Sequence, residues 1–300
     1  MRTFTTVGLG ELLWDVFPES CQLGGAPANF AYMTSLLGDE GIVASRVGRD
    51  ALGAEAKLRL EQMGLSPAWV QLDPTHGTGI VKVEVDAKGQ PTFEIAAPAA
   101  WDFFEWTPDW QALAQKADAV CFGSLAQRSP QSRETIHAFL RTIRTETVRV
   151  FDVNLRQCFY SAPILADSAK TADIMKLNHD ELPVLVQLLG FPFHDEESAA
   201  QWLLKTFPIK LVCITRGARG SLLVGEYAKH EHPGLPTQVA DTVGSGDAFT
   251  AALVYHYLRR ASLAEMNEAA NRMGSWVASH TGATPVRDEE RLAKIRSAGE

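Results

Sequence analysis

The chain has 300 residues, of which 46% are hydrophobic and 21% charged, a mixture that favours a compact globular protein over a disordered one. Its formal net charge of -8 at pH 7, without a basic stripe, excludes nucleic acid and anionic membrane surfaces as main partners. The sequence contains no run of about 18 apolar residues, so no membrane span is predicted. Because the segment Met1–Asp15 lacks the pattern of a signal peptide, we expect a cytoplasmic protein. The sequence contains no internal repeat, low-complexity tract or Ser/Pro-rich linker, so we expect one large domain over residues 1–300.

The cysteines are widely spaced and contain no C-x-x-C pair. This spacing argues against a zinc site or a disulfide framework, and it fits the reduced thiols of a cytoplasmic protein. We predict that Cys21, Cys121, Cys158 and Cys213 are all small core residues.

Apolar runs that favour β-structure alternate with helical patterns along most of the chain. The alternation predicts β-α-β units and a mostly parallel sheet with helices on both faces, a three-layer α/β/α sandwich. The predicted buried strands are Phe4–Leu9, Ala119–Gly123, Arg149–Val153, Ile174–Leu177 and Leu211–Thr215.

Residues 76–100 interrupt this alternation. Short β patterns at Thr78–Val85 and Thr92–Ala96 flank a turn at Asp86-Ala-Lys-Gly89, where Lys-Gly suits a positive φ. We expect a small β-sheet lid formed from about 12–22 and 76–100. The neighbouring aromatic residues are interpreted as packing of the lid connection on the main body, not as a sugar-stacking surface: Trp101, Phe103, Phe104, Trp106 and Trp110.

The run Asp241-Thr-Val-Gly-Ser-Gly-Asp247 precedes an apolar helical pattern at Thr250–Leu258. A glycine-rich turn at a helix N-terminus leaves backbone N–H groups free for an anion, and Gly244 and Gly246 lack the Cβ that would block its approach. In the first helical turn, Asp247 would stay ionised and could accept a hydroxyl proton. An ordinary helix start with a favoured aspartate is the alternative.

This run resembles the second signature, D-T-x-G-x-G-D, of the PfkB or ribokinase-like carbohydrate kinases. The resemblance implies a ribokinase-like sandwich with a lid, ATP as phosphoryl donor and Asp247 as the catalytic base. It further implies that the amides of Gly244, Ser245 and Gly246 form an anion hole.

The resemblance covers nearly the whole chain. Gly10-Glu-Leu-Leu-Trp-Asp15 is similar to the family's first strand and sugar-binding aspartate, and Gly24-Gly25-Ala-Pro-Ala-Asn29 is similar to its first signature. These matches imply that Asp15, Gly24, Gly25 and Asn29 bind the sugar. Read without the family, the segment at Asn29 is a loop-to-helix transition.

Other motifs resemble the nucleotide side of the family. Asn178-His-Asp-Glu181 resembles an N-x-x-E element that organises Mg²⁺ through water, although a helix cap is the alternative. Thr215-Arg-Gly217-Ala-Arg-Gly220 resembles a turn along the nucleotide phosphates, and Asn271 belongs to a segment that resembles the adenine wall. Asp241 and Val243 match positions that hold K⁺ in some members.

The substrate is indicated by Phe151-Asp-Val-Asn-Leu-Arg156, which is similar to a run of fructokinases and 2-keto-3-deoxygluconate kinases. We expect D-fructose as the first candidate substrate. An acidic or phosphorylated sugar is the alternative, because the Arg156 guanidinium could bind a carboxylate or phosphate group. A catalytically inactive binding protein of the same fold is an alternative from another class. A homodimer through paired lids is left open, because uncovered strand edges need a partner or a cover.

A dinucleotide oxidoreductase is disfavoured, because Gly8-Leu-Gly10-Glu-Leu-Leu13 lacks the third glycine of the fingerprint. The sequence also lacks the P-loop and protein-kinase motifs.

Overall fold

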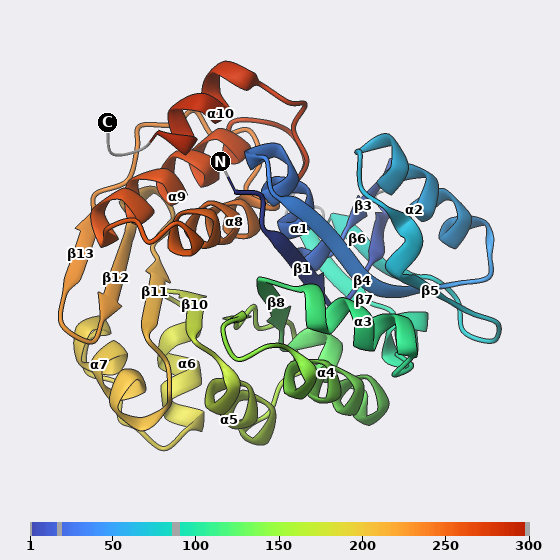
Figure 1. Cartoon of the computed structure of the whole chain (residues 1–300), viewed down its shortest axis with the longest axis horizontal. Coiled ribbons are helices and arrows are strands. Elements are labelled where there is room, and N and C mark those ends of the chain that lie inside the picture. Colours follow the sequence, from blue (N-terminus) through green and yellow to red (C-terminus); the bar gives the residue numbers. More distant parts are fainter. Residues whose placement is uncertain (1, 17–19, 86–90, 298–300) are drawn as a thin grey trace.

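The computed structural model of the chain describes residues 2–16, 20–85 and 91–297. Its strands form a large and a small sheet, with helices on both faces of the large one (Figure 1). The strands are β1 (Thr5–Leu9), β2 (Leu13–Val16), β3 (Cys21–Gly24), β4 (Glu40–Gly48), β5 (Val70–Asp73), β6 (Gly79–Val85), β7 (Pro91–Ile95), β8 (Ala119–Gly123), β9 (Val148–Asp152), β10 (Ile174–Asn178), β11 (Leu211–Thr215), β12 (Ser221–Gly225) and β13 (Lys229–His232). The helices are α1 (Ala26–Leu37), α2 (Ala51–Gln62), α3 (Pro108–Lys116), α4 (Pro130–Thr142), α5 (Ala162–Thr171), α6 (Glu181–Leu188), α7 (Glu196–Thr206), α8 (Ser245–Leu258), α9 (Leu263–Ala278) and α10 (Glu289–Arg296).

The large sheet has nine strands in the order β13-β12-β11-β10-β9-β8-β1-β4-β5. From β11 to β5 all neighbours are parallel, and β12 and β13 add an antiparallel edge. Each predicted strand overlaps β1, β8, β9, β10 or β11, so the predicted mostly parallel sheet is confirmed.

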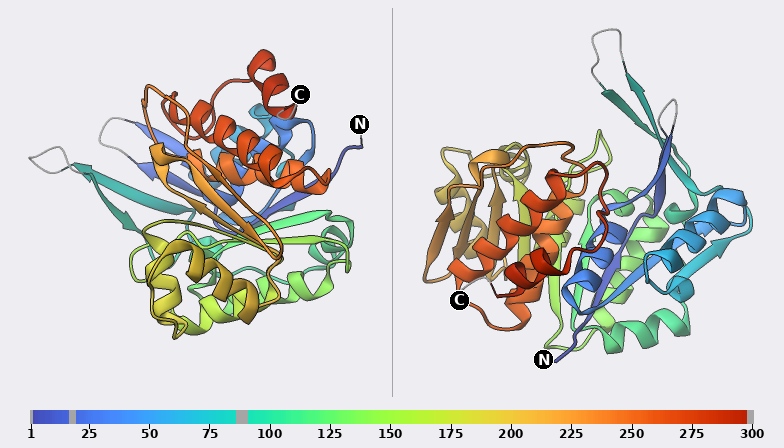
Figure 2. Two further views of the ribbon diagram at one scale, coloured as in Figure 1. Left: turned by 90° about the vertical axis from the view of Figure 1, so that its left-hand side faces the viewer. Right: turned by 90° about the horizontal axis from the view of Figure 1, so that it is seen from above.

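Helices cover both faces of the large sheet (Figure 2), and they contribute to two separate hydrophobic cores. One contains residues of α3 to α7, and the other contains residues of α1, α2, α8, α9 and α10. Trp101, Phe104 and Trp110 are buried in the first core, as the packing interpretation predicts, although Trp106 is partly exposed. The sandwich therefore has the three predicted layers.

The small sheet has the order β3-β2-β6-β7 and extends away from the main body (Figure 2). β6 and β7 form the expected antiparallel hairpin, and β2 pairs with β6 in parallel. The predicted turn at Asp86–Gly89 lies outside the described residues. At the base of this sheet, Gly79 packs on the indole of Trp101, so closely that a Cβ would lie 2.3 Å from Nε1.

The cysteine prediction is wrong for two of the four thiols. Cys121 and Cys213 lie in the core, whereas Cys21 and Cys158 are exposed. Cys21 begins β3 of the projecting sheet, and Cys158 lies in the loop after β9, so neither position has a layer to cover it. All four thiols are free. Within the described ranges, no helix is both long and apolar enough to span a bilayer.

Candidate active site

The glycine-rich run forms the start of α8. Gly244 caps the helix with φ 75°, in the left-handed region that suits glycine, and a Cβ there would lie 2.4 Å from the Cβ of Ala283. Gly246 lies over Lys176, whose Nζ would be 2.9 Å from an added Cβ. The Ser245 amide donates to Thr242 O at 3.3 Å. The helix N-terminus has the positive dipole end that favours an anion, while one of its first N–H groups, that of Ser245, is engaged with Thr242.

Asp247 is held in place by the start of a second helix. α1 begins after Gly25, which has φ 112°, and it carries Asn29 in its first turn. The Asn29 Nδ2 donates to Asp247 Oδ2 over 2.8 Å, and Asn29 is only 5% exposed. The two predicted signatures therefore meet at one carboxylate, at the edge of the sheet where β1, β8 and β9 end.

The environment of Asp247 raises its pKa to about 6. Burial is the main cause and the charge of Asp152 adds to it, while Lys176, the hydrogen bond from Asn29 and Arg156 all lower the pKa. A carboxyl with this pKa is largely ionised at neutral pH and is more basic than an ordinary aspartate.

A buried ion pair lies beneath the start of α8. The Lys176 Nζ contacts both carboxylate oxygens of Asp152 at 3.1 Å. Thr250 links this pair to the helix, because its Oγ1 lies 3.1 Å from Asp152 Oδ2 and donates to Gly246 O at 2.9 Å. Burial lowers the pKa of Lys176, but Asp152, Glu181 and Asp247 outweigh it and raise that pKa overall. The sequence interpretation missed these residues, although a lysine within the apolar strand β10 was a signal.

Two further predicted site residues are Asp15, which lies on β2, and Arg156, which lies in the loop after β9. Burial raises the pKa of Asp15 to about 6, and the Arg156 charge opposes this. Gly24 leaves room for that carboxylate, since a Cβ would lie 2.4 Å from Asp15 Oδ2. Arg156 is exposed and donates to Leu155 O at 3.1 Å, and its charge lowers the pKa of Asp15 and Asp247 alike. The Arg156 charge therefore acts on both predicted site carboxylates.

Glu11, which directly follows the Gly10 turn after β1, was assigned no role from the sequence. It is 3% exposed, and its Oε2 has no hydrogen-bond partner among the described residues. Together with Asp247 and Asn154 it lines a cavity of about 10 Å³. A charged residue within the run Gly10-Glu-Leu-Leu was the available signal.

The N-x-x-E element forms the start of α6. Asn178 Oδ1 accepts the N–H groups of Asp180 and Glu181, so Asn178 has the capping geometry of the alternative interpretation. The Glu181 carboxylate accepts the N–H of Leu155 through Oε1 and that of Asn178 through Oε2, each at 2.8 Å. Glu181 therefore anchors the loop that carries Arg156.

The remaining predicted nucleotide residues lie at the end of β11 and on α9. Thr215 ends β11, and Gly217 and Gly220 have φ values of 59° and 78° in the turn that follows. The amide of Asn271 donates to Ser221 Oγ at 2.7 Å and to Asn267. This buried network joins α9 to β12.

Asp241 connects two loops beside α8. Its Oδ1 accepts the Val243 N–H and its Oδ2 accepts the Gly282 N–H, both at 3.0 Å. Across the described residues, no cluster of three or more His, Cys, Asp or Glu side chains could hold a metal ion.

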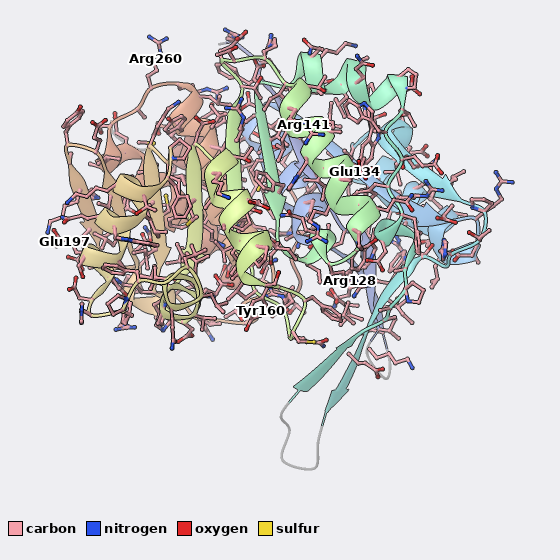
Figure 3. All side chains as sticks on the ribbon, turned by 90° about the horizontal axis from the view of Figure 1, so that it is seen from below. Arg128, Glu134, Arg141, Tyr160, Glu197 and Arg260 are labelled. Carbon is pink, nitrogen blue, oxygen red and sulfur yellow. The ribbon has the colours of Figure 1, made fainter. Side chains whose placement is uncertain are left out.

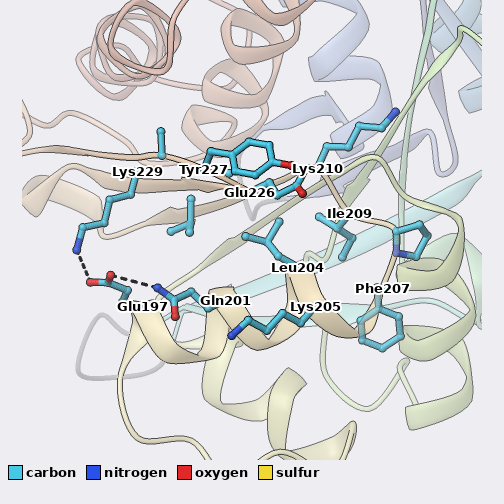
Figure 4. A pocket seen from close by; sticks show the side chains of 14 residues that line it. Glu197, Gln201, Leu204, Lys205, Phe207, Ile209, Lys210, Glu226, Tyr227 and Lys229 are labelled. Atoms are coloured by element: carbon cyan, nitrogen blue, oxygen red, sulfur yellow. Dashed lines mark hydrogen bonds and ion pairs between the residues drawn. The ribbon is translucent and has the colours of Figure 1, made fainter.

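A wider groove lies at the opposite edge of the sheet, between α7 and the turn joining β12 to β13 (Figure 4). Its lining includes Leu204, Phe207, Lys210 and the 91% exposed Tyr227. The predicted site residues are elsewhere, at the carboxyl ends of the parallel strands, where open α/β sheets bind ligands.

Comparison with known proteins identifies the family of the chain. Residues 9–290 match the model of the pfkB family of carbohydrate kinases. Fructokinase from Salmonella typhimurium is 31% identical over 259 residues, which is 82% of each chain. The chain therefore belongs to the pfkB carbohydrate kinase family.

Solved structures share the fold over almost the full length. A sugar kinase from Pyrococcus horikoshii in complex with ATP superposes with a TM-score of 0.81 and 26% identity, covering 97% of this chain and 99% of that one. A 2-dehydro-3-deoxygluconokinase from Thermotoga maritima gives a TM-score of 0.85 at 18% identity, covering 98% and 99%. The ribokinase-like fold expected from the sequence is confirmed.

Proposed function

We propose that this chain transfers the γ-phosphoryl group of ATP to a hydroxyl of a small sugar in the cytoplasm, with D-fructose as the first candidate. The observation that carries the proposal is Asp247 in the first turn of α8, held by Asn29 beside the glycine-rich helix start. A carboxylate and an anion-binding helix terminus at one place supply a base and charge stabilisation for phosphoryl transfer.

In this mechanism Asp247 accepts the proton of the acceptor hydroxyl while the hydroxyl oxygen bonds to the γ-phosphorus. The bond from that phosphorus to the ADP oxygen breaks on the opposite side. Backbone N–H groups at Gly244, Ser245 and Gly246 stabilise the charge on the phosphoryl oxygens. General-base assistance of this kind contributes about 10² to 10⁴ in rate.

Asp15, Gly24, Gly25 and Asn29 would hold the sugar. Asp15 is suited to this role, because one carboxylate can accept bonds from two hydroxyl groups. The small sheet that carries Asp15 would act as the lid, over about 12–22 and 76–100, and its closure would exclude water that otherwise hydrolyses ATP. Pairing of two such lids in a homodimer would cover the edge strands β3 and β7.

The nucleotide would lie along Asn178, Thr215, Gly217, Gly220 and Asn271. Mg²⁺ fits the site as an ion held by phosphate oxygens and water, with Glu181 acting through water, because one carboxylate and ATP satisfy its preferences. When bound, Mg²⁺ neutralises phosphate charge. Asp241 and the Val243 carbonyl are the candidate K⁺ ligands, and replacing K⁺ by choline in the assay tests that role.

Fructose is favoured by the 31% identical Salmonella typhimurium fructokinase. A second candidate, 2-keto-3-deoxygluconate, is favoured by Arg156, whose guanidinium could pair with a sugar carboxylate. These two candidate substrates differ in charge. Arg156→Met should therefore reduce kcat/KM much more for the acidic sugar than for fructose.

The deciding experiment is a coupled ADP-release assay with Mg-ATP across fructose, ribose, 2-keto-3-deoxygluconate, fructose 6-phosphate and adenosine, with Asp247→Ala as the control. Preference for fructose supports the first candidate, and turnover limited to an acidic or phosphorylated sugar supports a role for Arg156. Sugar binding without turnover would instead identify an inactive member of the fold.

A further inference from the structure

Glu11 is a buried carboxyl that the proposed mechanism does not use. It follows the Gly10 turn at the end of β1, beside the start of α1, and its side chain is 3% exposed. Its Oε2 is buried without a hydrogen-bond partner in the described part of the chain. A buried polar atom without a partner is costly, so a functional reason for its retention is expected.

The cavity next to Glu11 connects it to the proposed base. The cavity is lined by Glu11, by Asp247 of α8, and by Asp152 and Asn154 at the end of β9. Its volume of about 10 Å³ is close to what one water molecule needs. Most of its wall is apolar, with Phe30 and Phe122 among the lining residues, so the polar partners of a water would be the side chains of Glu11, Asp152, Asn154 and Asp247. One water could therefore bridge the two carboxyl groups.

We propose that Glu11 is the proton acceptor that follows Asp247, with one water in this cavity as the relay. This step rests on the proposed function. The acceptor hydroxyl loses its proton to Asp247 as the new O–P bond forms and the bond to ADP breaks. The proton then moves from Asp247 to the water, which passes one of its own protons to the ionised Glu11. Asp247 is left ionised, and Glu11 must release its proton to solvent before the relay can work in the next turnover.

The charges around Glu11 suit this role. Burial raises its pKa to about 7, and the charge of Asp247 adds to this, while backbone N–H groups of Glu11 and Ala26 and the Arg156 charge lower it. Cys121 of β8 also lines the cavity, and burial raises the pKa of its thiol well above its ordinary value, so the thiol stays neutral. Lys176 and Asp152 have opposite effects on Asp247, because the charge of Lys176 lowers its pKa and that of Asp152 raises it.

The relay requires both carboxyl groups to be ionised, so the pH profile of kcat distinguishes it from a structural role. In the wild type, log kcat should fall with a limiting slope of two below about pH 6, because the pair must lose two protons. Glu11→Gln keeps the shape of the side chain but cannot take a proton. We expect its kcat at pH 8 to fall about tenfold or more and its limiting slope to become one.

The matched control is Glu134→Gln, the same change at an exposed position on α4 (Figure 3), which should keep the wild-type rate and slope. Glu11→Asp keeps a carboxyl and should retain the slope of two at reduced rate. A wild-type slope of one would overturn the relay even if Glu11→Gln failed to fold. So would a Glu11→Gln variant with a slope of two, whatever its rate.

Failure of the relay is separate from failure of the proposed function. If Asp247→Asn is inactive while Glu11→Gln matches the wild type in rate and slope, only the relay is wrong. If Asp247→Asn keeps a near-normal kcat, the role of Asp247 and the relay are both wrong. If the wild type turns over no sugar, the proposed function is wrong.

Discussion

The amide of Asn29 donates a 2.8 Å hydrogen bond to the carboxylate of Asp247, which is 218 residues further along the chain. This bond joins the first turns of α1 and α8 across the edge of the large sheet. It fixes one carboxylate oxygen and leaves the other available for a substrate hydroxyl. Substitution at either end should therefore affect the same chemical step.

Asp247→Asn should lower kcat by about 10² to 10⁴ with little change in ATP affinity, because the amide cannot take the hydroxyl proton. Steady-state kinetics and calorimetric titration of ATP measure the two effects separately. Asp109→Asn, the same change in the first turn of α3, is the matched control. A near-normal kcat in Asp247→Asn would contradict the assignment of the base.

Lys176→Met should destabilise the protein by about 3 to 5 kcal/mol, because it leaves the buried Asp152 carboxylate without its cation. Equilibrium denaturation in urea measures the loss. Lys170→Met is the control, since Lys170 pairs with Asp167 at the surface and such pairs contribute only about 0 to 1 kcal/mol. Similar small losses in both variants would show that the buried pair contributes little.

Glu181→Gln should raise the Mg²⁺ concentration needed for half-maximal activity by about tenfold or more, because a charged group that acts on the ion through water is lost. Glu265→Gln is the matched control, since Glu265 also accepts a backbone N–H, that of Ser262, at the start of α9. If the Mg²⁺ requirement is unchanged while thermal stability falls, Glu181 only anchors the loop after β9.

Glu11→Gln should make stability less dependent on pH. Folding raises the pKa of Glu11 from 4.5 to about 7, so the folded state binds the proton more tightly than the unfolded chain. The resulting stability is present below about pH 4.5 and is lost as the pH rises through about 7. The wild type should therefore lose about 3 kcal/mol over this window that the variant does not lose. Thermal denaturation of both proteins from pH 4.5 to 8 tests this, and parallel curves would be the contrary result.

Much of the fold could be predicted because the central strands are apolar runs between helical patterns. β4 was not identified, because Ser45 and Arg46 interrupt its apolar run although both are buried. The antiparallel strand β13 has the sequence Lys-His-Glu-His, with no apolar residue to identify it. Its place at the sheet edge is set by pairing with β12, which is a tertiary effect.

Asp247 and Asn29 could be named from the sequence because each belongs to a short motif, and the structure places the two side chains in contact. Their roles stay predictions. Glu11, Asp152 and Lys176 were not named, because their contact with this place depends on which strands become neighbours. Lys176 on β10 reaches Asp152 only because β9 lies beside β10, and Thr250 joins them from α8. For Asn178 the structure shows the helix cap, since its side chain accepts the Glu181 N–H at the start of α6, and the role at Mg²⁺ stays a prediction.

The parallel pairing of β2 with β6 has a consequence for the order of folding. β3, α1, β4, α2 and β5 lie between these strands in the chain, so the small sheet cannot form from one local hairpin. Contacts between distant segments close large loops, and they form after local ones. Asp15, the proposed sugar ligand, lies on β2, so during synthesis the strand that carries it lacks its parallel partner until β6 has emerged.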